Sequence, residues 1–261
     1  MVCPSDPVSG KTGIQIGGSN YYANRGDQYY QWDFPSSDAQ RTAGRARGPF
    51  TRDGENLSYT SDGLSNTLFI LEVSGGIGNS TQVRQGFVRN TANSQLERGY
   101  NMNPIGCYQL NQGGQLNVPA DRLIGNFYTG GGTPPEEPNS LPGLRWNDGR
   151  SLFSQAFAIL PPNSPRCAAS QSGSGAGSGS QDYRMYNFIG AGSYHTGGVN
   201  VGFGDGSVRF ASEAVDWGGR GLSPKDAGVT GGANSETYAG KSVYGVWGAL
   251  GSAWAGDSGS L

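Results

Sequence analysis

The sequence is poor in the residues on which most hydrolases and metal proteins depend, with a single histidine, His195, and only three cysteines. One histidine leaves one base of that type for a Ser-His-Asp triad, and no GxSxG nucleophile elbow occurs. The cysteines form no CxxC pair and no EF-hand pattern is present, so a zinc or Ca²⁺ site would need ligands from distant segments. We therefore expect no catalytic residues and no cofactor. Of these two ions the sequence favours Ca²⁺, with ligands that it does not identify.

Long apolar runs and an excess of charge of either sign are also missing. The longest apolar stretch, Leu68–Val73, is far shorter than the about 18 residues of a membrane-spanning helix, and it contains Glu72. No positively charged region followed by a cleavage site marks a signal peptide. The formal net charge of −2 argues against nucleic acid as a partner, because nucleic-acid binding requires a basic face. The one local basic cluster, Arg41, Arg45 and Arg47, is expected in a solvated loop.

Glycine, in contrast, is abundant, at 46 of 261 residues. Hydrophobic residues make up a modest 34% of the chain, so we expect long loops around a limited core. The low charge and the aromatic content of 11% argue against a disordered chain. The Gly/Ser tract at 171–181 is expected to be a linker or an exposed loop.

The clearest structural signal is a β-hairpin at Val199–Ser212. Asp205 and Gly206 are expected to form a two-residue turn with φ > 0 at both positions. That turn would pair Phe203 with Val208 and Val201 with Phe210, so that these four apolar side chains, together with Val199, share the buried face. His195 lies ten residues before Asp205, a separation of up to about 33 Å in an extended chain. We therefore expect His195, Asp205 and Gly206 to have structural roles, Asp205 as a turn former and His195 as a hydrogen-bonding support.

Further elements follow from shorter patterns. A strand is expected at Thr67–Val73, a second at Gln82–Val88, and helix-compatible patches lie at Asp121–Asn126 and Ser151–Ile159. Glu72, at the end of an apolar strand, is expected to be a partly buried partner for an arginine. The fold class predicted is mainly β (α+β), an antiparallel sheet with long Gly-rich loops and minor helix. We expect a single domain over 1–261, with a loop-rich insertion at about 93–181 and a hairpin region at 186–216.

Six segments in order along the chain resemble a known bacterial family. They are CPSDP at Cys3–Pro7, SNYYAN at Ser19–Asn24, SDGLSNTLFILE at Ser61–Glu72, ILPPNSPRC at Ile159–Cys167, His-x9-Asp-Gly at His195–Gly206 and YGVWGALGS at Tyr244–Ser252. The chain resembles the prepilin-processing-associated family named domain of unknown function 1559, which carries the His-x9-Asp-Gly motif. The resemblance covers nearly the whole chain and describes architecture rather than an activity.

The resemblance implies the globular head of a pseudopilin-like or type IV pilin-like protein at the cell surface or in the periplasm, with a structural or assembly role. Its partners would be pilin-like subunits or further copies of itself. Relatives carry an N-terminal prepilin helix, their only contact with the membrane. This sequence shows no such helix, so either a partial chain or a natural helix-less relative is expected, the former more than the latter. A head without that helix should expose an apolar strip on the sheet around Leu68 and Ile70.

Three cysteines in an extracytoplasmic protein allow one intramolecular disulfide. We expect a Cys107–Cys167 disulfide, because it would close a long loop-rich segment, and Cys3 would then be unpaired. The other two pairings stay open.

Two other functions compete with the structural role. A carbohydrate-binding module would use aromatic loops with Trp32, Trp146 and Trp217, and a secreted hydrolase would need convergent carboxylates or a base beside a nucleophile.

Overall fold

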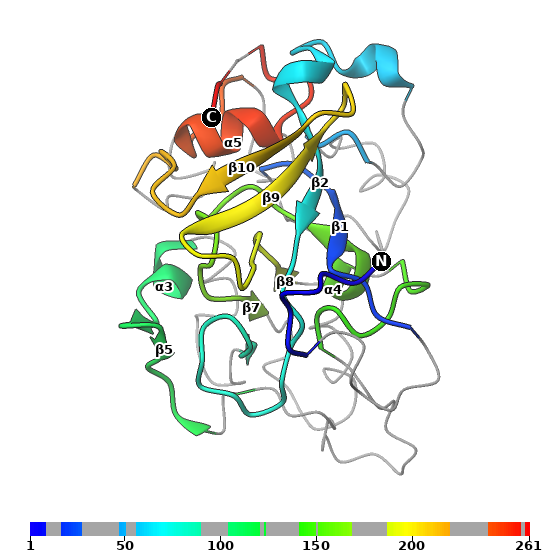
Figure 1. Ribbon diagram of the computed structural model, residues 1–261. Coiled ribbons are helices and arrows are strands. Elements are labelled where there is room, and N and C mark those ends of the chain that lie inside the picture. The colour runs from blue at the N-terminus through cyan, green and yellow to red at the C-terminus, as the bar shows by residue number, and fades with distance from the viewer. Residues whose placement is uncertain are drawn as a thin grey trace, which may run out of the picture.

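A five-stranded sheet forms the centre of the computed structural model, which describes residues 1–8, 17–27, 47–50, 56–89, 104–120, 123, 141–149, 151–168, 187–219, 240–256 and 259–261 (Figure 1). The strand order is β10-β9-β2-β1-β6. The strands are β1 (Tyr21–Asn24), β2 (Leu68–Glu72), β6 (Gln155–Ala156), β9 (Gly198–Phe203) and β10 (Val208–Ser212). Neighbours are antiparallel except β1 and β6, which run parallel, so the sheet is mixed where an antiparallel one was expected. The mainly β class is confirmed.

Smaller elements surround this sheet. A three-stranded sheet has the order β3-β7-β8, and β4 and β5 form a separate pair. These strands are β3 (Val88–Arg89), β4 (Asn111–Gln112), β5 (Gln115–Leu116), β7 (Cys167–Ala168) and β8 (Asn187–Phe188). The helices are η1 (Leu57–Tyr59), η2 (Leu64–Asn66), α3 (Pro104–Tyr108), α4 (Ser151–Ser154) and α5 (Gly245–Gly251). No described helix combines the length and the apolar character needed to cross a bilayer.

The main core lies on one face of the five-stranded sheet. Leu68 and Leu71 of β2 and Val201 of β9 pack there with Trp247 and Leu250 of α5. Helix α5 packs closely against the segment that contains Ala158. This is possible because Gly251, at the end of α5, has no side chain that would collide with Ala158. The sheet face that carries Leu68 is therefore covered. The prediction of an exposed apolar strip around Leu68 and Ile70 is wrong for Leu68, which is fully buried, while Ile70 is half-buried.

The β9–β10 hairpin is present, but its turn and register differ from the prediction. The loop has three residues, Gly204–Gly206, because the Phe203 N–H donates to the Ser207 carbonyl and the Gly206 N–H to the Phe203 carbonyl. Gly206 is left-handed at φ +84°, whereas Asp205 is not. This is the three-residue hairpin loop that ends in a left-handed glycine, one residue longer than the expected turn.

The longer loop shifts the register by one residue and reverses the faces of β10. Val208 pairs with Gly202, and Ala211 with Val199. The prediction that Val208 and Phe210 are buried is therefore wrong: they are 71% and 49% exposed, while Ala211 is buried. The β9 half of the prediction holds, since Val201 lies in the core.

A disulfide joins Cys107 of α3 to Cys167 of β7, 60 residues apart, as predicted. It lies in a second apolar cluster that also contains Val88 and Tyr244. The segment expected to be an insertion, about 93–181, contributes this disulfide, the buried residues of α4 and the edge strand β6.

Arg47 is the one member of the basic cluster that the structure describes. It forms a buried ion pair and does not lie in a solvated loop as predicted. Arg47 is fully buried; its Nε lies 2.6 Å from the Asp27 carboxylate, and its Nη1 donates to the Gly240 carbonyl. Arg41 and Arg45 lie outside the described residues, as do Trp32 and the Gly/Ser tract at 171–181.

Candidate metal centre

His195 lies in the loop that precedes β9, and backbone contacts fix this loop to the end of β2. The Gly192 N–H donates to the Glu72 carbonyl at 2.8 Å, which places the loop beside Glu72. The His195 N–H donates to the Ser193 hydroxyl at 3.1 Å, which makes a local turn before the histidine. These contacts direct the imidazole toward the carboxylate, and the hydrogen-bonding role predicted for His195 now has named partners.

Glu72 is the last residue of β2 and is buried. Its two carboxylate oxygens have different partners. Oε2 accepts the Asn200 backbone N–H at 2.9 Å, while Oε1 lies 3.4 Å from His195 Nε2. The arginine partner expected from the sequence is replaced by a histidine and by a backbone amide of the neighbouring strand.

Cys3 is the third side chain of this cluster. Its Sγ lies 3.6 Å from His195 Nε2, and it is a free, buried cysteine, in agreement with the predicted disulfide. The Cys3 N–H donates to Asn20 Oδ1, and Asn20 Nδ2 donates to Asp6 Oδ2 at 2.6 Å. Asp6 Oδ2 also accepts the Gly75 N–H at 2.7 Å, so a buried polar network anchors the N-terminal segment to the residues after β2.

The three ligand atoms of Cys3, Glu72 and His195 all lie within 4.8 Å of one another. Burial raises the pKa of the Cys3 thiol, and the hydrogen bond to the Glu72 carboxylate raises it further. A reactive cysteine needs the opposite setting, a positive environment that lowers its pKa. The cluster therefore does not suit a cysteine nucleophile, and a metal ion bound there would have to displace the thiol proton. The three side chains offer one sulfur, one nitrogen and one carboxylate oxygen as candidate ligands.

Asp205 and Gly206, the other residues of the His-x9-Asp-Gly motif, lie at the tip of the hairpin. The Asp205 carboxylate accepts the Ser207 N–H at 2.8 Å, and hydrogen bonds from Ser207 lower its pKa. The contacts of Asp205 are thus those of a turn residue, while His195 contacts Cys3 and Glu72.

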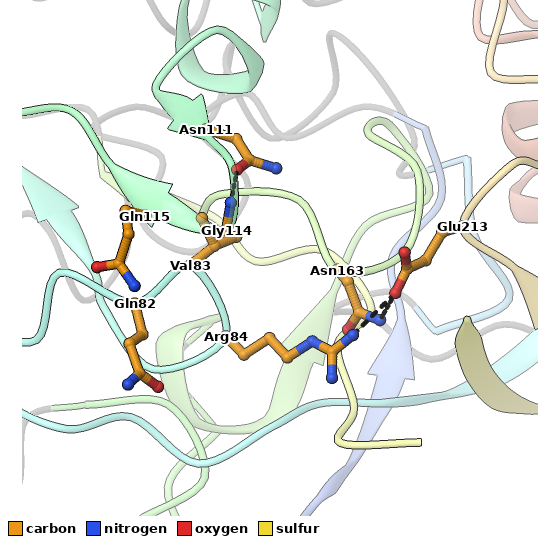
Figure 2. Close-up of a pocket in the computed structure, with 8 residues that line it drawn as sticks. All are labelled: Gln82, Val83, Arg84, Asn111, Gly114, Gln115, Asn163 and Glu213. Atoms are coloured by element: carbon orange, nitrogen blue, oxygen red, sulfur yellow. Dashed lines mark hydrogen bonds and ion pairs between the residues drawn. The ribbon is translucent and has the colours of Figure 1, made fainter. Parts of the chain in front are cut away.

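A polar cavity of about 380 Å³ lies near the His195 loop and is shown in Figure 2. Glu213 accepts from Asn163 Nδ2 at 2.5 Å and pairs with Arg84 at 3.0 Å. Asn163 Oδ1 in turn accepts the Ser193 N–H, which connects the cavity wall to the His195 loop. None of the eight lining residues is aromatic.

The two tryptophans of the proposed sugar-stacking set that the structure describes, Trp146 and Trp217, do not line this cavity. Trp217 packs on Tyr108, with ring centroids 4.7 Å apart, and Trp146 is 64% exposed. Neither is among the cavity's lining residues, so the described part of the chain offers no support for stacking of a sugar there.

The sequence interpretation missed the convergence of Cys3 and Glu72 on His195. No local spacing indicates it, because each ligand comes from a different part of the chain. A usable signal did exist: Cys3, Glu72 and His195 each lie in one of the six segments that carried the resemblance, as do Asp6 and Asn20 of the supporting network.

Comparison with known proteins gives one match. No curated protein and no solved structure matches the chain. The family model described as "Protein of unknown function (DUF1559)" matches residues 1–218, most of the chain and all three residues of the cluster. By that match, the chain belongs to the DUF1559 family.

Proposed function

We propose that this chain is the globular head of a pseudopilin-like, extracytoplasmic surface protein and that its role is structural, in assembly with like subunits. The observation that carries the proposal is the edge strand β10, which displays two large apolar side chains. Val208 is 71% and Phe210 49% exposed, and β10 pairs only with β9 within the described sheet. An exposed apolar edge strand is a ready site for pairing with another chain.

The edge strand also displays no charge beside its exposed apolar side chains, although charge there normally blocks such pairing. Its one charged residue, Arg209, lies with its guanidinium over the Phe203 ring, 4.2 Å from the ring centroid. Arg209 pairs with Val201 on the core side of the sheet, so its charge is not displayed beside Val208 and Phe210. This arrangement favours a second copy of the head as the occupant of the edge.

The disulfide supports the extracytoplasmic part of the proposal. Disulfides persist in oxidising compartments and are rare in the cytosol. The Cys107–Cys167 bond is buried between α3 and β7, where it joins two elements of the second core cluster.

The assembly role is tested by the oligomeric state of the chain. We expect the wild-type protein to associate as its concentration rises, measured by sedimentation velocity and light scattering. The double variant Val208→Lys, Phe210→Lys should remain monomeric and folded, with a melting temperature lowered by only a few degrees through the poorer strand propensity of lysine. Leu57→Lys is the matched control, because Leu57 is 58% exposed in η1, outside the sheet, and should leave association unchanged. A wild-type chain that stays monomeric at high concentration, or a double variant that associates equally well, would contradict the assembly role.

A further inference from the structure

We propose that Cys3, Glu72 and His195 form a binding site for one divalent transition-metal ion, with Zn²⁺ as the best-suited ion. This site goes beyond the assembly role and does not depend on it. The ligand atoms are Sγ of Cys3, a carboxylate oxygen of Glu72 and Nε2 of His195. They come from the N-terminal segment, the end of β2 and the loop before β9.

The first argument is that the two contacts between the imidazole and described side chains involve the same nitrogen. In a catalytic relay the histidine uses one ring nitrogen for the nucleophile and the other for the residue that orients it. Here Nε2 alone lies 3.6 Å from the thiol and 3.4 Å from the carboxylate. One ring nitrogen offers either one proton or one lone pair, so it cannot serve two partners fully. The three atoms all lie within 4.8 Å of one another, close enough to be ligands of one ion.

The second argument comes from the distances between the ligand atoms. Zinc binds sulfur at about 2.3 Å and nitrogen or oxygen at about 2.1 Å, and a tetrahedron with those bonds places S and N about 3.6 Å apart and N and O about 3.4 Å apart. The structure has 3.6 Å between Cys3 Sγ and His195 Nε2, and 3.4 Å between His195 Nε2 and Glu72 Oε1. Both separations match the corresponding edges of a zinc tetrahedron, and the third pair, Cys3 Sγ and the Glu72 carboxylate oxygen, lies within 4.8 Å.

The ligand types select the class of ion. Thiolate and imidazole suit zinc and its neighbours in the transition series, whereas Ca²⁺ and Mg²⁺ take oxygen ligands. A cation would also balance the buried carboxylate of Glu72 that faces the Cys3 sulfur. The set therefore favours Zn²⁺ over the Ca²⁺ considered from the sequence.

An ion can reach the cluster from solvent, and hydrogen bonds hold two of its ligands in place. Cys3 and Glu72 are buried, while the His195 side chain is 33% exposed, so an ion reaches the cluster from the histidine side. Three protein ligands leave a fourth position for water or a small ligand, as in zinc sites with an open position. Asn200 holds Glu72 Oε2 and Asn20 holds the Cys3 backbone, which orients two ligands before any ion arrives.

The test uses the full chain, stripped of metal by a chelator that leaves the disulfide intact. Zn²⁺ should bind with a stoichiometry of one by calorimetry, Co²⁺ should give a sulfur-to-metal charge-transfer band, and Ca²⁺ should give no heat. Loss of an outer-shell partner already weakens metal binding by about 10–100-fold, so Glu72→Gln and His195→Gln should each weaken it by at least about 100-fold. Cys3→Ser should abolish the charge-transfer band. Glu213→Gln, a matched change in the nearby cavity, should bind like the wild type.

A second measurement on the wild-type chain does not depend on whether the variants fold. Cys3 is the one free cysteine, so bound Zn²⁺ should slow its alkylation by iodoacetamide at least about tenfold relative to the stripped protein. An unchanged alkylation rate, or equal Zn²⁺ affinity in the wild type and His195→Gln, would overturn the site and leave a hydrogen-bonded polar cluster. The β10 double variant should bind Zn²⁺ normally, which separates this outcome from failure of the assembly role.

Discussion

At the scale of single residues, Tyr22 shows how a buried polar group contributes to stability. Its hydroxyl donates to the Leu152 carbonyl at 3.0 Å and accepts the Gly143 N–H at 2.6 Å. The ring is fully buried in the main core. Removing the hydroxyl would leave both backbone groups without this partner in a dry environment, where each unsatisfied group costs about 1–3 kcal/mol.

Tyr22→Phe should therefore lower the free energy of unfolding at neutral pH and change its dependence on alkaline pH. Burial raises the pKa of Tyr22 well above its ordinary value of 10.0. Above pH 10 the unfolded chain loses this proton while the folded chain retains it, so stability falls as pH rises. Urea unfolding from neutral to alkaline pH should show a steeper loss above pH 10 for the wild type than for Tyr22→Phe. Equal slopes would contradict the burial of the ionisable hydroxyl.

At the scale of elements, the hairpin gives a paired test of its register. Val201 is 1% exposed in the core, whereas Phe210 on the partner strand is 49% exposed. Val201→Asp buries a charge and should cost at least about 4 kcal/mol or prevent folding. Phe210→Asp should cost only about 1 kcal/mol, mainly through the low strand propensity of aspartate.

Chemical unfolding of both variants measures this difference. The same substitution on two paired strands separates burial from the chemistry of the new side chain. If Phe210→Asp proved as damaging as Val201→Asp, the register with a two-residue turn would be correct and the three-residue loop wrong.

The hairpin also shows how far the sequence predicts an element. Alternation of apolar residues located β9, and the apolar run at Thr67–Val73 located β2 to within one residue at each end. The length of the turn was not predictable, because Asp205-Gly206 suits either a two-residue turn or the end of a three-residue loop. Main-chain hydrogen bonds at Phe203 decide between them. Since side chains alternate along a strand, that one-residue error reversed every side chain of β10.

At the scale of the whole molecule, the disulfide joins two parts of the second core that lie 60 residues apart. In the chain-entropy model, closing a loop of this length stabilises the folded state by about 4 kcal/mol. The double variant Cys107→Ser, Cys167→Ser should lose stability by about that amount in urea unfolding. Cys3→Ser, which removes a cysteine outside the disulfide, should change stability by less than about 1.5 kcal/mol. A double variant as stable as the wild type would show that this bond does not hold the second cluster together.

Long-range organisation was only partly predictable from the sequence. Three cysteines allowed three pairings, and the loop-rich segment between Cys107 and Cys167 favoured the one that the structure contains. The metal cluster did not, because Cys3, Glu72 and His195 meet only after β2, its neighbouring loops and the N-terminal segment are in place. The network that positions Cys3 runs through Asn20 and Asp6, and its hydrogen bonds have no signature in composition or periodicity.

In the proposed metal site, three distant segments of the chain place one sulfur, one nitrogen and one carboxylate oxygen around a single ion. X-ray absorption at the zinc edge, on protein loaded with one equivalent of Zn²⁺, identifies the ligand atoms themselves. We expect one sulfur at about 2.3 Å together with nitrogen and oxygen ligands at about 2.0–2.2 Å. The sulfur contribution should disappear in Cys3→Ser. A first shell without sulfur in the wild type, or a sulfur signal that persists in Cys3→Ser, would contradict the claim.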